Sequence, residues 1–165
     1  MTKAITKAII LAAGMGSRLK EMGEDIPKGF IRLDETPIIE HSLNALISMG
    51  IQEVMIVTGH KCEFYEKLKE TYPEIRTIKN TRFAETGTMC SLGHARDFVN
   101  ADFIMLESDL IYDPIVITEL LNSPYKDCLL LSGTTNAGDE VYVEADENRM
   151  TAISKSRDHI KNSVR

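Results

Sequence analysis

The sequence contains no tryptophan and only three cysteines in 165 residues. Tryptophan is the side chain that best holds a quaternary ammonium group, so its absence disfavours a site for such a ligand. Cys62, Cys90 and Cys128 form no C-x-x-C pair and have no spacing with histidine that indicates a zinc site. We therefore expect the three cysteines to be reduced thiols that bind no zinc.

Neither an excess of positive charge nor a long hydrophobic run is present. The chain has 19 basic and 25 acidic residues and a formal net charge of -6, which gives no general electrostatic reason to bind nucleic acid. The apolar run 8–14 is short for a secretory signal, and no stretch reaches the length that spans a bilayer. We expect a cytoplasmic protein without a nucleic-acid or membrane partner, in which any phosphate site depends on a few local basic residues.

Short apolar segments alternate with segments of helical periodicity, which is typical of an α/β protein. Residues 8–12 form a continuous apolar run, which indicates a strand buried on both faces of a parallel sheet. Further strands are expected at 53–58, 75–79, 103–106 and 128–131, followed by a hairpin of 141–145 and 150–154. The pattern predicts one compact unit with a mostly parallel sheet, whose ligands bind at the carboxyl ends of the strands.

The predicted helices have start and stop signals. One helix is expected to begin at Pro37 with Thr36 as its cap and to end at Gly50. Two others are expected at 62–71 and 89–99. A fourth is expected to open at Pro114 with Asp113 as its cap.

A glycine-rich segment follows the first predicted strand. In L-A-A-G-M-G-S-R-L, residues 11–19, Gly14 and Gly16 let backbone N–H groups approach phosphate oxygens, and Arg18 adds a positive charge. The third glycine of a Rossmann fingerprint is absent because Leu19 occupies its place, and no G-K-[S/T] of a P-loop follows. The segment is therefore either a phosphate site of another kind or a tight turn beside an exposed arginine.

Two carboxylates follow the predicted strand 103–106. Glu107 and Asp109 are separated by one residue, so both side chains leave on the same face if the strand geometry persists. Such a pair suits Mg²⁺, which takes hard oxygen ligands and keeps water and substrate phosphates in its other positions. The same two residues can also solvate the strand end and cap the next turn.

The glycine-rich segment, followed by Pro27-Lys28, resembles the signature of the sugar-1-phosphate and alcohol-phosphate nucleotidyltransferases. The resemblance implies a three-layer, Rossmann-like (GT-A-like) α/β fold with a mostly parallel sheet. It implies that Arg18 and Lys28 are catalytic residues that bind a triphosphate, although Lys28 taken alone also fits a surface lysine after a proline turn. The nucleotide-binding residues implied for the loop are Leu11, Ala12, Ala13, Gly14 and Gly16.

The resemblance also assigns roles to later residues. Asp109 stands where the family places its metal-binding aspartate, and Glu107 stands where another aspartate is often found, which implies a Mg²⁺ cofactor. Residues 86–92 resemble the family's segment that reads base and ribose, which implies that Thr88 and Ser91 bind the nucleotide. These two hydroxyls can equally satisfy backbone donors at the start of a helix.

Residues 80–92, 106–114 and 132–156 resemble the 2-aminoethylphosphonate cytidylyltransferases. The resemblance implies transfer of CMP from CTP to 2-aminoethylphosphonate with release of pyrophosphate. Asp139 and Glu140 are then expected to bind the primary ammonium group of this acceptor, unless they form a solvated acidic turn.

The sequence is also compatible with other functions. A phosphocholine cytidylyltransferase, a sugar-1-phosphate nucleotidyltransferase and a nucleotide-binding module without catalysis all fit the same loop. The resembling enzymes continue into a region that carries a second metal-binding aspartate, which is not identifiable here after Lys155. Residues 1–165 are therefore expected to be the N-terminal portion of a nucleotidyltransferase domain.

Overall fold

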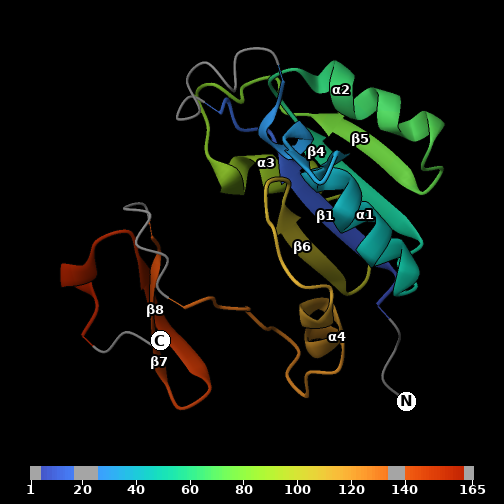
Figure 1. Ribbon diagram of the computed structural model, residues 1–165. Coiled ribbons are helices and arrows are strands. Elements are labelled where there is room, and N and C mark those ends of the chain that lie inside the picture. Colours follow the sequence, from blue (N-terminus) through green and yellow to red (C-terminus); the bar gives the residue numbers. More distant parts are fainter. Residues whose placement is uncertain (1–4, 17–25, 134–139, 162–165) are drawn as a thin grey trace. The chain divides into compact units, whose positions relative to one another are not determined.

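The computed structural model describes residues 5–16, 26–133 and 140–161 (Figure 1). The chain forms two compact units, Met1–Asn122 and Ser123–Arg165, and each is described by itself. Within the described ranges, none of the helices has both the length and the apolar character needed to cross a membrane.

A four-stranded parallel sheet forms the centre of the first unit. Its strands are β1 (Lys7–Ala12), β4 (Glu53–Thr58), β5 (Ile75–Lys79) and β6 (Phe103–Glu107), in the order β5-β4-β1-β6. β1 lies between β4 and β6, and its Ile10 is opposite Ile56 on one side and Leu106 on the other. The strands expected from the apolar runs between residues 8 and 106 are confirmed, as is the α/β fold with a parallel sheet.

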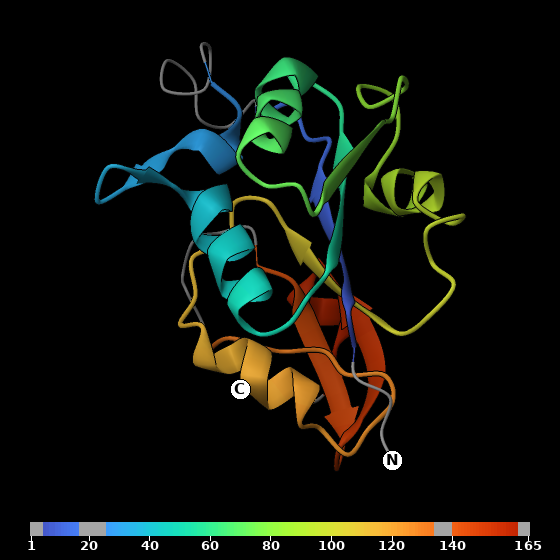
Figure 2. The ribbon, with the colours of Figure 1, turned by 90° about the vertical axis from the view of Figure 1, so that its right-hand side faces the viewer.

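Helices cover both faces of this sheet, as Figure 2 shows. The helices are α1 (Ile38–Ser48), α2 (Cys62–Lys67), α3 (Thr88–His94) and α4 (Ile115–Leu121). Ile10 packs in a hydrophobic cluster with α1, α2 and α4, whereas Ile9 packs in a second cluster with Ala95 and Phe98, which follow α3. Neighbouring residues of β1 enter different clusters because successive side chains of a strand point to opposite faces.

The start of α1 differs from the sequence prediction. Thr36 does not cap the helix, because Thr36–Pro37 forms strand β3, which pairs antiparallel with β2 (Arg32–Leu33). The first helical N–H, that of Ile38, donates instead to the backbone oxygen of Ile31 at 2.9 Å. A backbone oxygen before the hairpin thus accepts the hydrogen bond at the start of the helix, where the sequence predicted a threonine side chain.

The other helix ends follow the sequence signals in part. Gly50, with φ of 92°, follows the end of α1, as predicted. Asp113 accepts a hydrogen bond from the N–H of Ile115 at 3.0 Å, which confirms its expected role before α4. α3 ends at His94 instead of Val99, because the chain continues from there in turns that bring Phe98 into the core.

The second unit contains an antiparallel hairpin of β7 (Tyr142–Asp146) and β8 (Arg149–Ser154), which confirms the predicted hairpin. The predicted strand at 128–131 is wrong, since these residues are in no strand. Leu129, Leu130 and Leu131 are 56%, 48% and 43% exposed. An apolar run favours burial, but it becomes a strand only where a neighbouring strand pairs with its backbone.

Candidate functional site

A cavity of about 380 Å³ lies at the carboxyl ends of β1 and β6 in the first unit. Its walls come from the loop after β1, the 3-10 turn Lys28–Phe30, α2, the first residue of α3 and the loop after β6. The predicted site residues among its lining are Leu11, Ala12, Gly14, Gly16, Lys28, Thr88, Glu107 and Asp109. The fold thus brings together five separate segments of the sequence.

The loop after β1 presents its backbone to the cavity. Gly16 has φ of 67°, a left-handed conformation that glycine adopts without steric cost. A Cβ atom on Gly16 would lie 3.4 Å from Cγ of Lys28, so the lysine side chain runs beside this backbone. Among the described residues, no other atom lies within 4 Å of the Cβ position of Gly14. Ala13 is buried, and its carbonyl oxygen points toward Gly59: a Cβ atom on Gly59 would lie only 2.5 Å from this oxygen.

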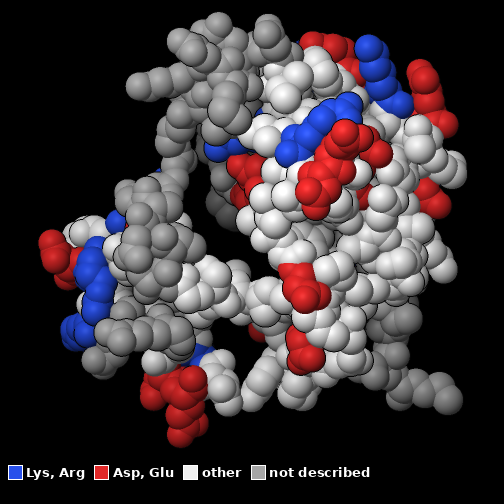
Figure 3. All heavy atoms as spheres, in the orientation of Figure 1, with Lys and Arg blue, Asp and Glu red and all other residues white. Residues whose placement is uncertain are grey.

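Lys28 and Asp109 form an ion pair at this cavity. Nζ of Lys28 lies 3.3 Å from Oδ2 of Asp109, and the two side chains are 30% and 37% exposed. The pair is therefore accessible to a ligand in the cavity. Figure 3 draws one face of the first unit, where basic side chains lie next to acidic ones. In the part of the chain that the structure describes, this face therefore has no extended positive surface.

A close contact between backbones holds the two partners of this pair near each other. Gly29 is buried, and a Cβ atom on it would lie 2.9 Å from the backbone oxygen of Ser108. No side chain fits there unless one of the two segments moves. Gly29 therefore sets the distance between the turn that carries Lys28 and the loop that carries Asp109.

Tyr65 of α2 lies beside Gly29 and Ser108 and also lines the cavity. Its side chain is 1% exposed, and its ring packs edge-on against Phe30 with centroids 5.2 Å apart. Burial raises the pKa of Tyr65 to about 12, the Asp109 charge raises it too, and hydrogen bonds with Ser108 and the Gly29 backbone oppose the rise. The hydroxyl therefore stays protonated at neutral pH beside both segments.

Glu107 and Asp109 place two carboxylates at the cavity. Burial raises the pKa of Glu107, the Asp109 charge raises it further, and Lys28 lowers it. Carboxylate oxygens are ligands that suit Mg²⁺. In the described part of the chain, no group of three His, Cys, Asp or Glu residues is arranged to hold a metal ion. A magnesium ion here would complete its coordination with water and ligand phosphates, as this ion commonly does.

Thr88 and Ser91 lie on the same helix but have different surroundings. Thr88 begins α3 and lines the cavity. Ser91 is only 4% exposed, and its hydroxyl accepts a hydrogen bond from Nδ2 of Asn80 at 3.1 Å. The structure therefore places Thr88 at the cavity wall, whereas Ser91 is hydrogen-bonded to the residue that follows β5.

The remaining predicted residues are not part of this cavity's described wall. Arg18 and Asp139 lie outside the described residues. Glu140 belongs to the second unit, just before β7. Sequence reasoning missed Gly29, Tyr65 and Ser108, because a glycine after lysine and a tyrosine at a core position of a helix carry no signal of a site.

The first unit is an α/β domain with a glycine loop after the first strand and a cavity at the carboxyl ends of the strands, which is where folds of this class bind ligands. Residues 8–154 match the MobA-like NTP transferase domain, and the chain belongs to this family. The family assignment confirms the resemblance to the nucleotidyltransferases.

Two curated cytidylyltransferases are similar to the chain. It is 33% identical over 155 residues to the 2-aminoethylphosphonate cytidylyltransferase of Lancefieldella rimae, a match that covers 91% of this chain and 61% of the relative. It is 30% identical over 119 residues to the choline-phosphate cytidylyltransferase of Streptococcus pneumoniae, which covers 72% of this chain and 52% of the relative. The chain thus matches only a little over half the length of these relatives.

A solved structure supports the fold. The inositol-1-phosphate CTP transferase from T. maritima superimposes with a TM-score of 0.78 at 21% identity, covering 96% of this chain and 67% of the other. At this identity the similarity concerns the fold alone. It confirms the nucleotidyltransferase type of α/β fold that the sequence resemblance implied.

Proposed function

We propose that the cavity beside Lys28 binds CTP and that the protein transfers CMP to 2-aminoethylphosphonate, with release of pyrophosphate. The observation that carries the proposal is the meeting of the β1 loop, Lys28 and Asp109 at one cavity. The similarity to a 2-aminoethylphosphonate cytidylyltransferase over 91% of the chain supports both the nucleotide and the acceptor.

The proposed reaction is a displacement at the α-phosphorus of CTP. A phosphonate oxygen of the acceptor forms a bond to this phosphorus, while the bond from the phosphorus to the oxygen that bridges to the β-phosphate breaks. The bonding electron pair leaves with pyrophosphate. Because the attacking phosphonate is already anionic, no side chain has to remove a proton, and positioning and electrostatics carry the catalysis.

The chain's own groups supply positive charge and positioning in this proposal. Backbone N–H groups near Gly14 and Gly16 bind phosphate oxygens, because glycine has no side chain of its own to stand in the way. The ammonium group of Lys28 stabilises the charge that develops on the phosphates in the transition state. Arg18 adds a second positive charge to the triphosphate, a role that rests on the family resemblance.

Enzymes of this family typically use a divalent metal ion. We assign its place to Asp109 with Glu107, whose carboxylates would hold Mg²⁺ at the cavity. When bound, the ion supplies positive charge that offsets the charge of the triphosphate. Burial and the Asp109 charge both raise the pKa of Glu107, so a nearby cation would stabilise the ionised pair.

The acceptor is proposed from its ammonium group. Asp139 and Glu140 offer carboxylates to a primary ammonium group, which can donate three hydrogen bonds. Phosphocholine is the second candidate acceptor, because a relative with 30% identity is a choline-phosphate cytidylyltransferase. Its quaternary ammonium group cannot donate hydrogen bonds and is best held by aromatic faces, and the sequence has no tryptophan.

Pyrophosphate release tests this function. The protein is incubated with Mg²⁺ and each of CTP, UTP, ATP and GTP, in combination with 2-aminoethylphosphonate, phosphocholine or glucose 1-phosphate. The proposal predicts the fastest release with CTP and 2-aminoethylphosphonate. Faster release with another pair would replace the assigned substrates, and CTP binding without release from any pair would indicate a nucleotide-binding module without catalysis.

A further inference from the structure

We propose that Asn80 is a positioning residue for the nucleotide: its buried amide fixes the loop 80–87 and thereby places Thr88 at the cavity wall. The inference rests on the proposed function, because it concerns the affinity of the same cavity for CTP. It assigns Asn80 no contact with the nucleotide itself.

The Asn80 amide joins three parts of the chain. The residue follows β5 directly and is completely buried, with 0% of its surface exposed. Its Nδ2 donates hydrogen bonds to Oγ1 of Thr86 at 2.9 Å and to Oγ of Ser91 at 3.1 Å. Its Oδ1 accepts a hydrogen bond from the N–H of Arg82 at 2.9 Å. One side chain thus connects a strand end, a loop and α3.

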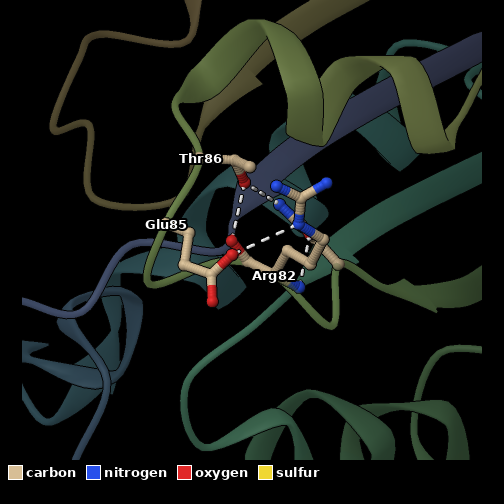
Figure 4. Close-up of polar contacts among 4 residues, drawn as sticks. Arg82, Glu85 and Thr86 are labelled. Atoms are coloured by element: carbon tan, nitrogen blue, oxygen red, sulfur yellow. Dashed lines mark hydrogen bonds and ion pairs between the residues drawn. The ribbon is translucent and has the colours of Figure 1, made fainter.

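Contacts within the loop complete this arrangement (Figure 4). Thr86 Oγ1 donates to the backbone oxygen of Arg82 at 2.8 Å, and the side chain of Arg82 pairs with Glu85 at 3.3 Å. The Arg82 and Glu85 side chains are 71% and 70% exposed, so their ion pair adds little to stability. The buried amide of Asn80 therefore does more than the surface ion pair to hold the loop.

Asn80 holds the chain on both sides of Thr88. Thr86 precedes Thr88 and Ser91 follows it by one turn of α3, and both hydroxyls bond to the same amide nitrogen. Thr88 itself lines the cavity. Movement of either hydroxyl would shift the start of α3 and with it this part of the wall.

The sheet does not depend on the Asn80 side chain. The backbone N–H of Asn80 donates to the backbone oxygen of Thr58 at 2.8 Å, and a substitution leaves this bond in place. Loss of the amide would instead leave the N–H of Arg82 and the hydroxyls of Thr86 and Ser91 without it as a partner. The cost is greatest at Ser91, which is 4% exposed, and smaller at Arg82 and Thr86, which water can reach. The expected effect is therefore local, in the loop and the start of α3.

Binding of CTP to four variants tests the inference. We expect Asn80→Ala to raise the Kd for CTP, measured by calorimetry with Mg²⁺ present, by about tenfold, as the loss of buried hydrogen bonds implies. Thr86→Val, which removes one hydroxyl at nearly constant volume, should raise Kd by a smaller factor, and Thr86→Ser should restore the wild-type Kd. The kcat at saturating CTP should not change in any of them. Tyr72→Phe is the matched control. It removes the 3.1 Å hydrogen bond that the Tyr72 hydroxyl donates to Glu40, and Tyr72 does not line the cavity.

The outcomes separate this inference from the proposed function. If Asn80→Ala and Thr86→Val leave the Kd for CTP unchanged, the inference is overturned, even if the melting temperature falls. Asn80 would then have a structural role only. An equal rise of Kd in Tyr72→Phe would overturn it too. If Asn80→Ala fails to fold, the comparison of Thr86→Val with Thr86→Ser decides. Failure of the wild-type chain to bind CTP would instead remove the proposed function, and the inference with it.

Discussion

Lys28 is the residue with the most direct role in the proposed chemistry. Its ammonium group lies 3.3 Å from Asp109 at the cavity, so Lys28→Ala removes a positive charge aimed at the phosphates. We expect kcat/KM to fall by about 100- to 1000-fold, or roughly 3 to 4 kcal/mol, as for loss of one transition-state donor. Lys69→Ala, which removes a surface lysine paired with Glu66, should leave kcat/KM unchanged. Near wild-type kinetics in Lys28→Ala would remove this lysine from the site.

Asp109 is expected to connect nucleotide binding to magnesium. Asp109→Asn keeps the shape of the side chain but removes the charge that would hold the ion, so the Mg²⁺ concentration needed for half-maximal CTP binding should rise about tenfold or more. Asp97→Asn is the control, since that side chain is 94% exposed. The assignment fails if the magnesium titration is unchanged in Asp109→Asn while circular dichroism shows an intact fold.

Some site residues are readable in the sequence, and others are not. Gly14 and Gly16 are predictable because their type and spacing suit phosphate binding, whereas the role of Lys28 is predictable only through the family resemblance. Tyr65 was not predicted, because a tyrosine on the buried face of a helix is usually a core residue. Its closeness to Ser108 is a property of packing between α2 and the loop after β6, which no local pattern encodes.

At the scale of elements, the fit of the Lys28–Phe30 turn against the β6 loop is tested by two glycine substitutions. Gly29→Ala places a methyl group 2.9 Å from the Ser108 oxygen, so we expect a loss of about 1 to 3 kcal/mol in the free energy of unfolding, together with lower activity. Gly93 lies within α3, and no atom of the described residues comes within 4 Å of its Cβ position, so Gly93→Ala should stabilise the protein by about 0.5 to 1 kcal/mol. Denaturant titrations and kcat/KM measure both effects, and equal behaviour of the two variants would contradict the close contact.

The sequence predicted elements best where burial alone decides the structure. Continuous apolar runs locate β1 and β4, because these two strands are mostly buried, with side chains from both faces entering the two hydrophobic clusters. The cap at Thr36 was wrong because a hairpin of two short strands precedes α1. The strand at 128–131 was wrong because an apolar run does not reveal whether another strand pairs with it.

At the scale of the whole molecule, the choice of acceptor is expected to depend on Glu140. We predict that CTP reacts faster with 2-aminoethylphosphonate than with phosphocholine. Glu140→Gln should reduce the ratio of the two kcat/KM values by about tenfold, as loss of a hydrogen bond to a charged group implies. Glu147→Gln, at the turn between β7 and β8, is the control and should leave the ratio unchanged. Equal kcat/KM values of the wild type for the two acceptors would contradict the assignment of the acceptor.

The central claim is that the cavity at the ends of β1 and β6 is the nucleotide site. Amide hydrogen exchange, followed by mass spectrometry with and without CTP and Mg²⁺, tests it most directly because it locates the ligand along the backbone. We expect slower exchange in 11–16, 28–30 and 107–109 when CTP is present, with the β7–β8 turn at 147–148 unchanged. Binding of CTP that leaves the exchange of those three segments unaltered, or that protects a different part of the chain instead, would contradict it.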